Sequence, residues 1–339
     1  MKLAIHDSDS ILNFNCIQYC KNNNIEYVLV DSYSSEIINF VKTEKVTHYF
    51  WHFHHILYED ILMARYLLFS LQKMGIKVYP NFNTSWYFDD KVAEKYILET
   101  VGAPVVPSWV FYSKKIALNW LRNETKYPLV AKLRRGAGSY NVILLRSYGE
   151  AKKYCDKMFS KGINPAPKIF ADIKSKFIIA NRSNNLISRL KKMPRFFKIM
   201  LKARRSFPNE MGYVYFQEFI PGASCDYRIV VVNDKAWGSM RKVRDNDFRA
   251  SGAGQSYEDP SLIPVSLVKL AFEISDNLDS QSMSYDFVID SEGYPHIVEC
   301  SCFFGFDGGD GSFYWDRDLV LHYESFRLSD VILDKLLVD

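Results

Sequence analysis

The feature that most constrains the fold is an alternation of short apolar runs with helix-like stretches over the first 80 residues. The clearest helical stretch, 60–74, ends at Gly75. The apolar runs lie at 2–6, 26–31, 47–53 and 76–80. Such alternation predicts parallel strands joined by crossover helices. No G-x-G-x-x-G motif follows the first run, so a dinucleotide-binding domain of the usual kind is not indicated. We expect an α/β domain over residues 1–88.

A different pattern begins at residue 89. The stretch DDKVAEKYILETVG has acidic residues at its start and a glycine at its end, and predicts a connecting helix. Further on, YPLVAKLRRGAGSYNVILL predicts a strand, a glycine-containing turn and a second strand. The remaining elements expected are strands at 108–112, 213–219, 226–232 and 235–240, helices at 114–123 and 262–278, and a hairpin at 285–300.

These elements indicate an antiparallel, α+β second half. We expect two subdomains after the first domain. One spans 89–212 and includes the glycine turn and a basic helical insertion at 164–212, and the other spans 213–339.

Composition bounds the class of protein. In 339 residues, 48% are hydrophobic and 24% charged, which is typical of a soluble globular chain. Asp7 and Asp9 precede any apolar stretch of signal-peptide length, and no later run has the length of a membrane span. The six cysteines lack the paired spacing of a zinc site. We therefore expect a cytoplasmic protein with reduced thiols.

The positive charge is concentrated in one segment. Residues 168–205 hold twelve lysines and arginines against Asp172 alone, whereas the whole chain has a formal charge of only +4. This asymmetry disfavours a nucleic-acid-binding protein with a basic face throughout. The segment is either a lid that recruits a polyanionic substrate, a basic amphipathic contact with a membrane surface, or a solvated helical insertion.

The hairpin DFVIDSEGYPHIVECS carries two carboxylates near its ends. With the turn centred on Glu292 and Gly293, Asp286 faces Glu299 and Ser284 faces Ser301, all on one side of the hairpin. Opposed like charges destabilise a sheet unless they are neutralised, and Mg²⁺ favours one or two carboxylates combined with substrate phosphates. The hairpin predicts a nucleotide–metal site. The alternative is a solvated pair, or a pair with one acid protonated.

Lys132 lies inside the apolar strand PLVAKLR, where a lysine is costly unless it meets an anion. Gly136 and Gly138 follow at once, and such glycines free backbone N–H groups for phosphate oxygens. The alternative is that Lys132 faces outward into solvent. The histidines of WHFHH, namely His52, His54 and His55, are expected at a strand end beside an acceptor site, or else as ordinary side chains.

Taken in order, five segments resemble the ATP-grasp superfamily. They are DDK at 89–91, AKLRRGAGS, QEFIPG with DYR, the run MRKVRDNDFRASGAG at 240–254, and DFVID with IVECS. The resemblance covers about residues 89–305, and residues 1–86 are similar to the α/β domain that usually precedes the grasp. It therefore implies an ATP-grasp fold with an N-terminal parallel α/β domain. Some of these runs also resemble RimK-like proteins and ATP-grasp proteins linked to surface polysaccharides.

The resemblance implies ATP and Mg²⁺ as cofactors. Lys91 and Lys132 would contact ATP phosphates, and the loop 136–140, with Gly136, Gly138 and Ser139, would close over them. Gln217, the Glu218 backbone and the N–H of Ile220 would face adenine, and Asp226 the ribose.

Asp286 and Glu299 would hold the metal, as the hairpin geometry also suggests. Many members have asparagine two residues after the second carboxylate. Ser301 stands there in this chain and is a weaker metal ligand. Arg241, Arg244 and Arg249 would stabilise the transferred phosphoryl group or an acyl phosphate, because fixed positive charge is needed where negative charge develops.

The implied activity is an ADP-forming carboxylate–amine ligase that works through an acyl phosphate. The expected partners are an amine and a uronic acid, a sugar-linked carboxylate or an amino acid. Two alternatives stay open: a kinase with the same ATP site, and a non-catalytic nucleotide-binding protein.

Overall fold

The computed structural model describes residues 1–136, 141–166, 201–202, 204–243, 256–304 and 310–338. Its N-terminal sheet is parallel, as the alternating pattern predicts, and its strand order is β2-β1-β3-β4. The strands are β1 (Lys2–His6), β2 (Glu26–Val30), β3 (His48–Phe50) and β4 (Lys77–Tyr79). The helices are α1 (Ile11–Asn22), α2 (Ile37–Thr43), α3 (Tyr58–Lys73) and α4 (Phe82–Ser85).

Local signals place the ends of these helices. The Ser10 hydroxyl accepts a hydrogen bond from the backbone N–H of Asn13 and so caps α1. After α3 the chain reverses at Gly75, whose φ of 83° is a conformation that glycine adopts without strain. β3 is shorter than the predicted run 47–53, so the residues after Phe50 form a loop at the carboxyl end of the sheet.

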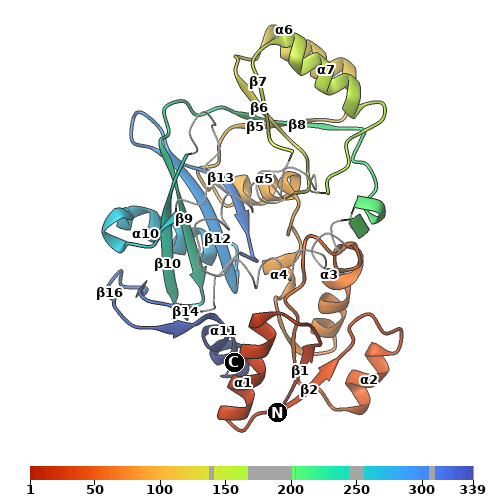
Figure 1. Cartoon of the computed structure of the whole chain (residues 1–339), viewed down its shortest axis with the longest axis vertical. Coiled ribbons are helices and arrows are strands. Elements are labelled where there is room, and N and C mark those ends of the chain that lie inside the picture. Colours follow the sequence, from red (N-terminus) through yellow and green to blue (C-terminus); the bar gives the residue numbers. More distant parts are fainter. Residues whose placement is uncertain (137–140, 167–200, 203, 244–255, 305–309, 339) are drawn as a thin grey trace, which may run out of the picture.

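The second sheet is antiparallel and has the order β5-β8-β6-β7; we call it the lid sheet. Figure 1 shows α6 and α7 packed together beside it at one end of the molecule. The bounds are α5 (Lys91–Thr100), β5 (Ser108–Phe111), α6 (Lys114–Asn123), β6 (Leu129–Lys132), β7 (Ile143–Leu145), α7 (Tyr148–Met158) and β8 (Val214–Glu218). The predicted strand–turn–strand around the glycines is the pair β6 and β7.

The largest sheet lies in the C-terminal part and has the order β13-β12-β9-β10-β15-β16, with β11 on β10. Its bounds are β9 (Cys225–Val232), β10 (Lys235–Lys242), β11 (Ser256–Tyr257), β12 (Ser282–Ile289), β13 (Pro295–Ser301), β15 (Tyr314–Trp315) and β16 (Leu321–His322). Around it lie η1 (Pro260–Leu262), α10 (Val265–Asn277), the strand pair β14 (Asp310–Gly311) and β17 (Phe326–Arg327), and α11 (Leu328–Val338).

Gly238 is required on β10, because a Cβ there would lie 2.4 Å from the carbonyl oxygen of Arg228.

The hydrophobic residues form two separate cores. One joins the N-terminal sheet to the C-terminal sheet and includes Leu3, Phe50, Tyr285 and Trp315. The other belongs to the lid sheet with α6 and α7 and is centred on Trp120. The parallel domain and the large sheet therefore share one apolar interior, and the lid has its own.

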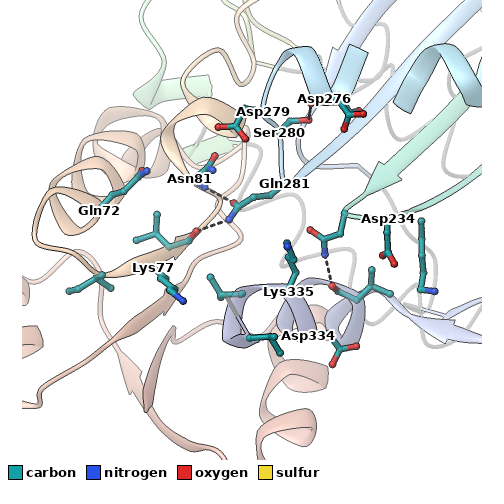
Figure 2. A pocket seen from close by; sticks show the side chains of 18 of the residues that line it. Gln72, Lys77, Asn81, Asp234, Asp276, Asp279, Ser280, Gln281, Asp334 and Lys335 are labelled. Atoms are coloured by element: carbon teal, nitrogen blue, oxygen red, sulfur yellow. Dashed lines mark hydrogen bonds between the residues drawn. The ribbon is translucent and has the colours of Figure 1, made fainter. Parts of the chain in front are cut away.

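Hydrogen bonds also link the parallel domain to the large sheet. The Gln281 side chain accepts a hydrogen bond from Asn81 N at 2.7 Å and donates one to Val78 O at 3.1 Å (Figure 2). The Tyr79 hydroxyl meets the Ser282 hydroxyl at 2.8 Å. A pocket of about 1090 Å³ lies where the parallel domain meets the large sheet, and its lining includes charged residues of both signs, among them Lys77, Asp276 and Lys335 (Figure 2).

No helix in the described part of the chain is both long enough and apolar enough to cross a membrane.

Candidate active site

The hairpin of β12 and β13 places its two carboxylates opposite each other. Asp286 pairs with Glu299 and Ser284 with Ser301, as predicted. Closer to the turn, however, Phe287 pairs with Ile297, one residue out of step. Val298 is therefore an extra residue, a β-bulge, and the prediction of one uniform register along the hairpin is wrong. The bulge turns the carbonyl of Val298 into an acceptor for Lys132, whose Nζ lies 2.9 Å away.

Side chains of the protein neutralise both acids. Asp286 accepts two hydrogen bonds from Arg228, at 2.8 and 2.9 Å, and a third from Arg241 at 2.8 Å. Glu299 accepts from Lys91 at 2.9 Å. Burial opposes ionisation of Asp286, but Arg228 and Arg241 outweigh it and hold the pKa of that carboxyl below its usual range. Asp286 is buried and ionised, so the alternative of a solvated pair is wrong for this residue.

The two acids still have acceptor sites that fit a divalent cation. Oδ2 of Asp286 accepts from both arginines, whereas Oδ1 accepts from Arg228 alone. Among the described residues no hydrogen bond reaches Oε2 of Glu299. A carboxylate has about four acceptor sites, and one or two carboxylates are what Mg²⁺ takes beside phosphate oxygens. In the described part of the chain no three His, Cys, Asp or Glu side chains are grouped as a metal site, so a cation here would depend on these two carboxylates.

Two lysines converge on the same place from different elements. Lys91, at the start of α5, donates to the carbonyl of Gly136 at 3.0 Å as well as to Glu299. Lys132, at the end of β6, is buried, and so the alternative of a solvent-facing lysine is wrong. Burial, with the nearby charge of Lys91, lowers the pKa of Lys132 to about 8, although Glu299 opposes this shift. The cluster unites the lid sheet, α5 and the hairpin.

Comparison with known proteins shows which fold carries this cluster. Residues 197–309 match the RimK-like ATP-grasp domain family. A RimK domain ATP-grasp protein from Sphaerobacter thermophilus is similar in structure, with 16% identity, a TM-score of 0.50, and 91% of this chain and 93% of that chain covered. The chain has the ATP-grasp fold, and its residues 197–309 match an ATP-grasp family.

Two other ATP-grasp structures share the fold. D-alanine–D-alanine ligase from Bacillus anthracis, solved with ATP, is 14% identical with a TM-score of 0.52, over 89% of this chain and 86% of that one. Biotin carboxylase from Campylobacter jejuni, solved as a β-γ-ATP complex, is 12% identical with a TM-score of 0.56, over 90% of this chain and 66% of that one. No curated protein matches the sequence.

Two acids of this ATP-grasp site were not singled out as site residues. Asp89 accepts from the N–H of Gly136 at 2.9 Å, and burial raises its pKa to about 6. Glu94 is buried beneath Lys91, and burial raises its pKa to about 8. The signal available was the charge pattern DDKVAE, in which we interpreted the acids only as helix-start residues. Asp90 does have that role, because its side chain caps α5 at Val92 and Ala93.

Several predicted ATP-grasp residues have protein partners here. Asp226, expected at the ribose, forms a buried pair with Arg241 through hydrogen bonds of 2.6 and 2.7 Å. Burial and the nearby Asp286 raise the pKa of Asp226 to about 6. The Ser301 hydroxyl donates to Phe303 O at 2.5 Å. These contacts do not test the predicted roles in ribose binding, phosphoryl transfer and metal binding, which stay predictions.

The predicted adenine-facing residues lie where β8 ends. Gln217 is buried on β8, and the N–H of Glu218 donates to Pro107 O at 2.9 Å. Ile220 follows in a turn. Gly138, Ser139, Arg244 and Arg249 lie outside the described residues, as does most of the basic segment 168–205.

The histidines after β3 lie beside the hairpin. The His52 ring is 4.3 Å from that of Phe303, and His55 is close enough to Lys91 and Glu299 for their charges to act on it. Burial lowers the pKa of His55 to about 4, so this imidazole is neutral at physiological pH. The loop at the carboxyl end of the parallel sheet thus lies near the lysine–acid cluster, and a place for these histidines beside an acceptor site stays a prediction.

Proposed function

We propose that the protein is an ATP-dependent carboxylate–amine ligase. The observation that carries this proposal is the convergence of Lys91 and Lys132 on the hairpin with Asp286 and Glu299, which lies in the segment that matches a RimK-like ATP-grasp domain. In the reaction, a substrate carboxylate oxygen attacks the γ-phosphorus of ATP and ADP leaves. An amine then attacks the acyl carbon of the acyl phosphate, inorganic phosphate leaves with the C–O bonding pair, and the nitrogen loses a proton.

The chain's own residues supply position and charge. Lys91 and Lys132 would bind phosphate oxygens, and Arg241 would stabilise charge that develops on the transferred group. Asp286 and Glu299 would hold Mg²⁺, which would neutralise negative charge on the phosphate groups. In the structure Lys91 pairs with Glu299, and Arg228 and Arg241 pair with Asp286.

The substrate classes that we propose for the carboxylate are an amino acid, a uronic acid and a sugar-linked carboxylate, in surface polysaccharide synthesis. The resemblance of the sequence to RimK-like and polysaccharide-associated proteins supports them. A kinase would use the same lysines and acids, so the fate of the γ-phosphate distinguishes the two activities.

The test is an incubation of the purified chain with ATP, Mg²⁺ and a panel of amino acids, uronic acids and amines, with ADP, AMP, phosphate and product mass recorded. We expect ADP and phosphate only when a carboxylate and an amine are both present. Glu299→Ala should abolish turnover, whereas Glu273→Ala, which changes an exposed acid of α10, should not. Phosphate retained on the acceptor would indicate a kinase, and AMP would contradict the acyl phosphate. ATP binding without turnover would favour a substrate outside the panel or a non-catalytic protein.

A further inference from the structure

A second pocket lies on the opposite side of α5 from the lysine–acid cluster. Its volume is about 640 Å³. Lys91 and Glu94 project from the buried face of α5, whereas Ala93 and Tyr96 line this pocket. Arg134 and Arg135 form part of its wall just before Gly136. The pocket is therefore separate from the ATP-grasp site but shares a wall with the start of the glycine loop.

Aromatic side chains from five parts of the chain line this pocket. They are Tyr58, Trp86, Tyr96, Tyr112 and Tyr213. Tyr112 is 63% exposed at the surface. Rings that remain open to solvent offer flat apolar faces with a polar hydroxyl at the edge, which suits a ligand that is apolar on its faces and polar around its rim.

A buried carboxylate lies in the wall with one oxygen unused. Glu210 is 8% exposed. Its Oε2 accepts from the Arg134 N–H at 3.1 Å and from the Tyr213 hydroxyl. Its Oε1 has no hydrogen-bond partner within the described ranges, and neither does Nε of Arg134. Nε of Arg134 and Nε of Arg135 each lie 3.9 Å from Oε1, beyond hydrogen-bond distance.

A hydroxyl group is the chemical complement of this corner. It can accept from a guanidinium N–H and donate to the carboxylate oxygen at the same time, whereas a second cation or anion satisfies only one of them. The Arg134 side chain is 42% exposed and so can move outward to admit such a group. The charged lining consists of two arginines, Asp90 and Glu210, which balance. This balance disfavours phosphates and carboxylated sugars.

We propose that this pocket binds a neutral saccharide. Its pyranose faces pack against the tyrosine and tryptophan rings, and its hydroxyl groups bridge Glu210 to Arg134 and Arg135. The proposal does not depend on the ligase activity, because it concerns a pocket outside the lysine–acid cluster.

The test is calorimetric titration of the full chain with maltose, cellobiose and N,N′-diacetylchitobiose, with glucuronate and inorganic phosphate as charged comparators. We expect saturable one-to-one binding of at least one neutral disaccharide. Tyr112→Ala should weaken it by about tenfold, the equivalent of one lost aromatic contact. Tyr294→Ala is the matched control, since Tyr294 is equally exposed, at 63%, on the hairpin turn.

Glu210→Gln should also weaken binding, and thermal unfolding of each variant shows whether it is folded. Three outcomes would overturn the proposal: no neutral disaccharide binds, binding is the same in Tyr112→Ala as in the wild type, or glucuronate or phosphate binds more tightly than every neutral sugar.

Discussion

Lys132 and Lys91 belong to one cluster, but their ammonium groups have opposite pKa shifts. Burial lowers the pKa of Lys132 to about 8. Burial acts on Lys91 as well, but Glu299, Glu94 and Asp89 outweigh it and raise the pKa of that amine. Lys132 is therefore the lysine of the pair that changes charge near physiological pH, because Lys91 has adjacent carboxylates and Lys132 has a neutral carbonyl, that of Val298.

This difference predicts how ATP binding depends on pH. Phosphate oxygens bind the protonated amine, and a lysine whose pKa is lowered is neutral above that pKa. We expect the dissociation constant for ATP to rise at pH values above about 8, by up to about tenfold for each pH unit. Titration at neutral pH and one unit above the Lys132 pKa measures the effect.

Lys132→Arg is the control, because arginine stays charged over this range and should remove the dependence. An equal affinity of the wild type at both pH values would show that Lys132 does not bind the phosphates.

At the scale of elements, two hairpins close with the same arrangement. In the first, Asp290 accepts from Glu292 N, Tyr294 N and His296 Nε2 at 2.8 to 2.9 Å. In the second, Asp316 accepts from Asp318 N, Val320 N and His322 Nε2 at 2.7 to 3.0 Å. Hydrogen bonds to these carboxylates, the largest from the histidine, lower the pKa of each aspartate. A shared spacing, D-x-x-x-x-x-H, therefore closes two turns of the sheet.

Only the first hairpin carries the acids Asp286 and Glu299, so substitutions of Asp290 and Asp316 should affect nucleotide binding differently. Asp290→Ala should lower the thermal unfolding temperature and weaken binding of Mg²⁺ and ATP, because its hairpin holds Asp286 opposite Glu299. Asp316→Ala should lower only the unfolding temperature. The pKa of each aspartate is lower in the folded protein than its ordinary value of 3.8. The ionised carboxylate therefore stabilises the fold above pH 3.8, and this stabilisation is lost as the pH falls through the lowered pKa. Both decreases in unfolding temperature should therefore be smaller in acid. Equal nucleotide affinities in the two variants would contradict the assignment.

At the scale of the whole molecule, the two hydrophobic cores do not follow the order of the domains in the sequence. The parallel domain and the large sheet are far apart in sequence but share one interior, whereas the lid between them in sequence is separate. The chain thus consists of a body, which is the parallel domain with the large sheet, and a lid. The predicted boundaries at 88 and 212 stay predictions.

This division predicts two units of unfolding. Trp120→Ala removes the residue around which Trp109, Phe111 and Phe216 pack, at a cost of about 3 to 5 kcal/mol. Backbone amides should lose their protection from hydrogen exchange in the lid sheet, α6 and α7 but not in the body. Trp315→Ala should have the reverse pattern. Loss of protection throughout the chain in both variants would show a single cooperative unit.

Local patterns determined most of the elements, because periodicity and turn residues act within a few positions of the chain. The helix 114–123, the parallel pairing of the strands in the first domain and the opposition of Asp286 and Glu299 were all predicted from neighbouring residues alone. For Lys132 the sequence left two alternatives, a buried lysine that meets an anion and one that faces solvent, and the structure shows it buried.

The tertiary structure decided which groups neutralise those acids. Arg228 and Arg241 reach Asp286 because β9 lies between β12 and β10, and Lys91 reaches Glu299 from 208 positions away. The bulge at Val298 and the fusion of the two sheets into one core also depend on non-local packing. Residue periodicity reports which side of an element is buried, but the partner that buries it is set only when the sheets and helices assemble.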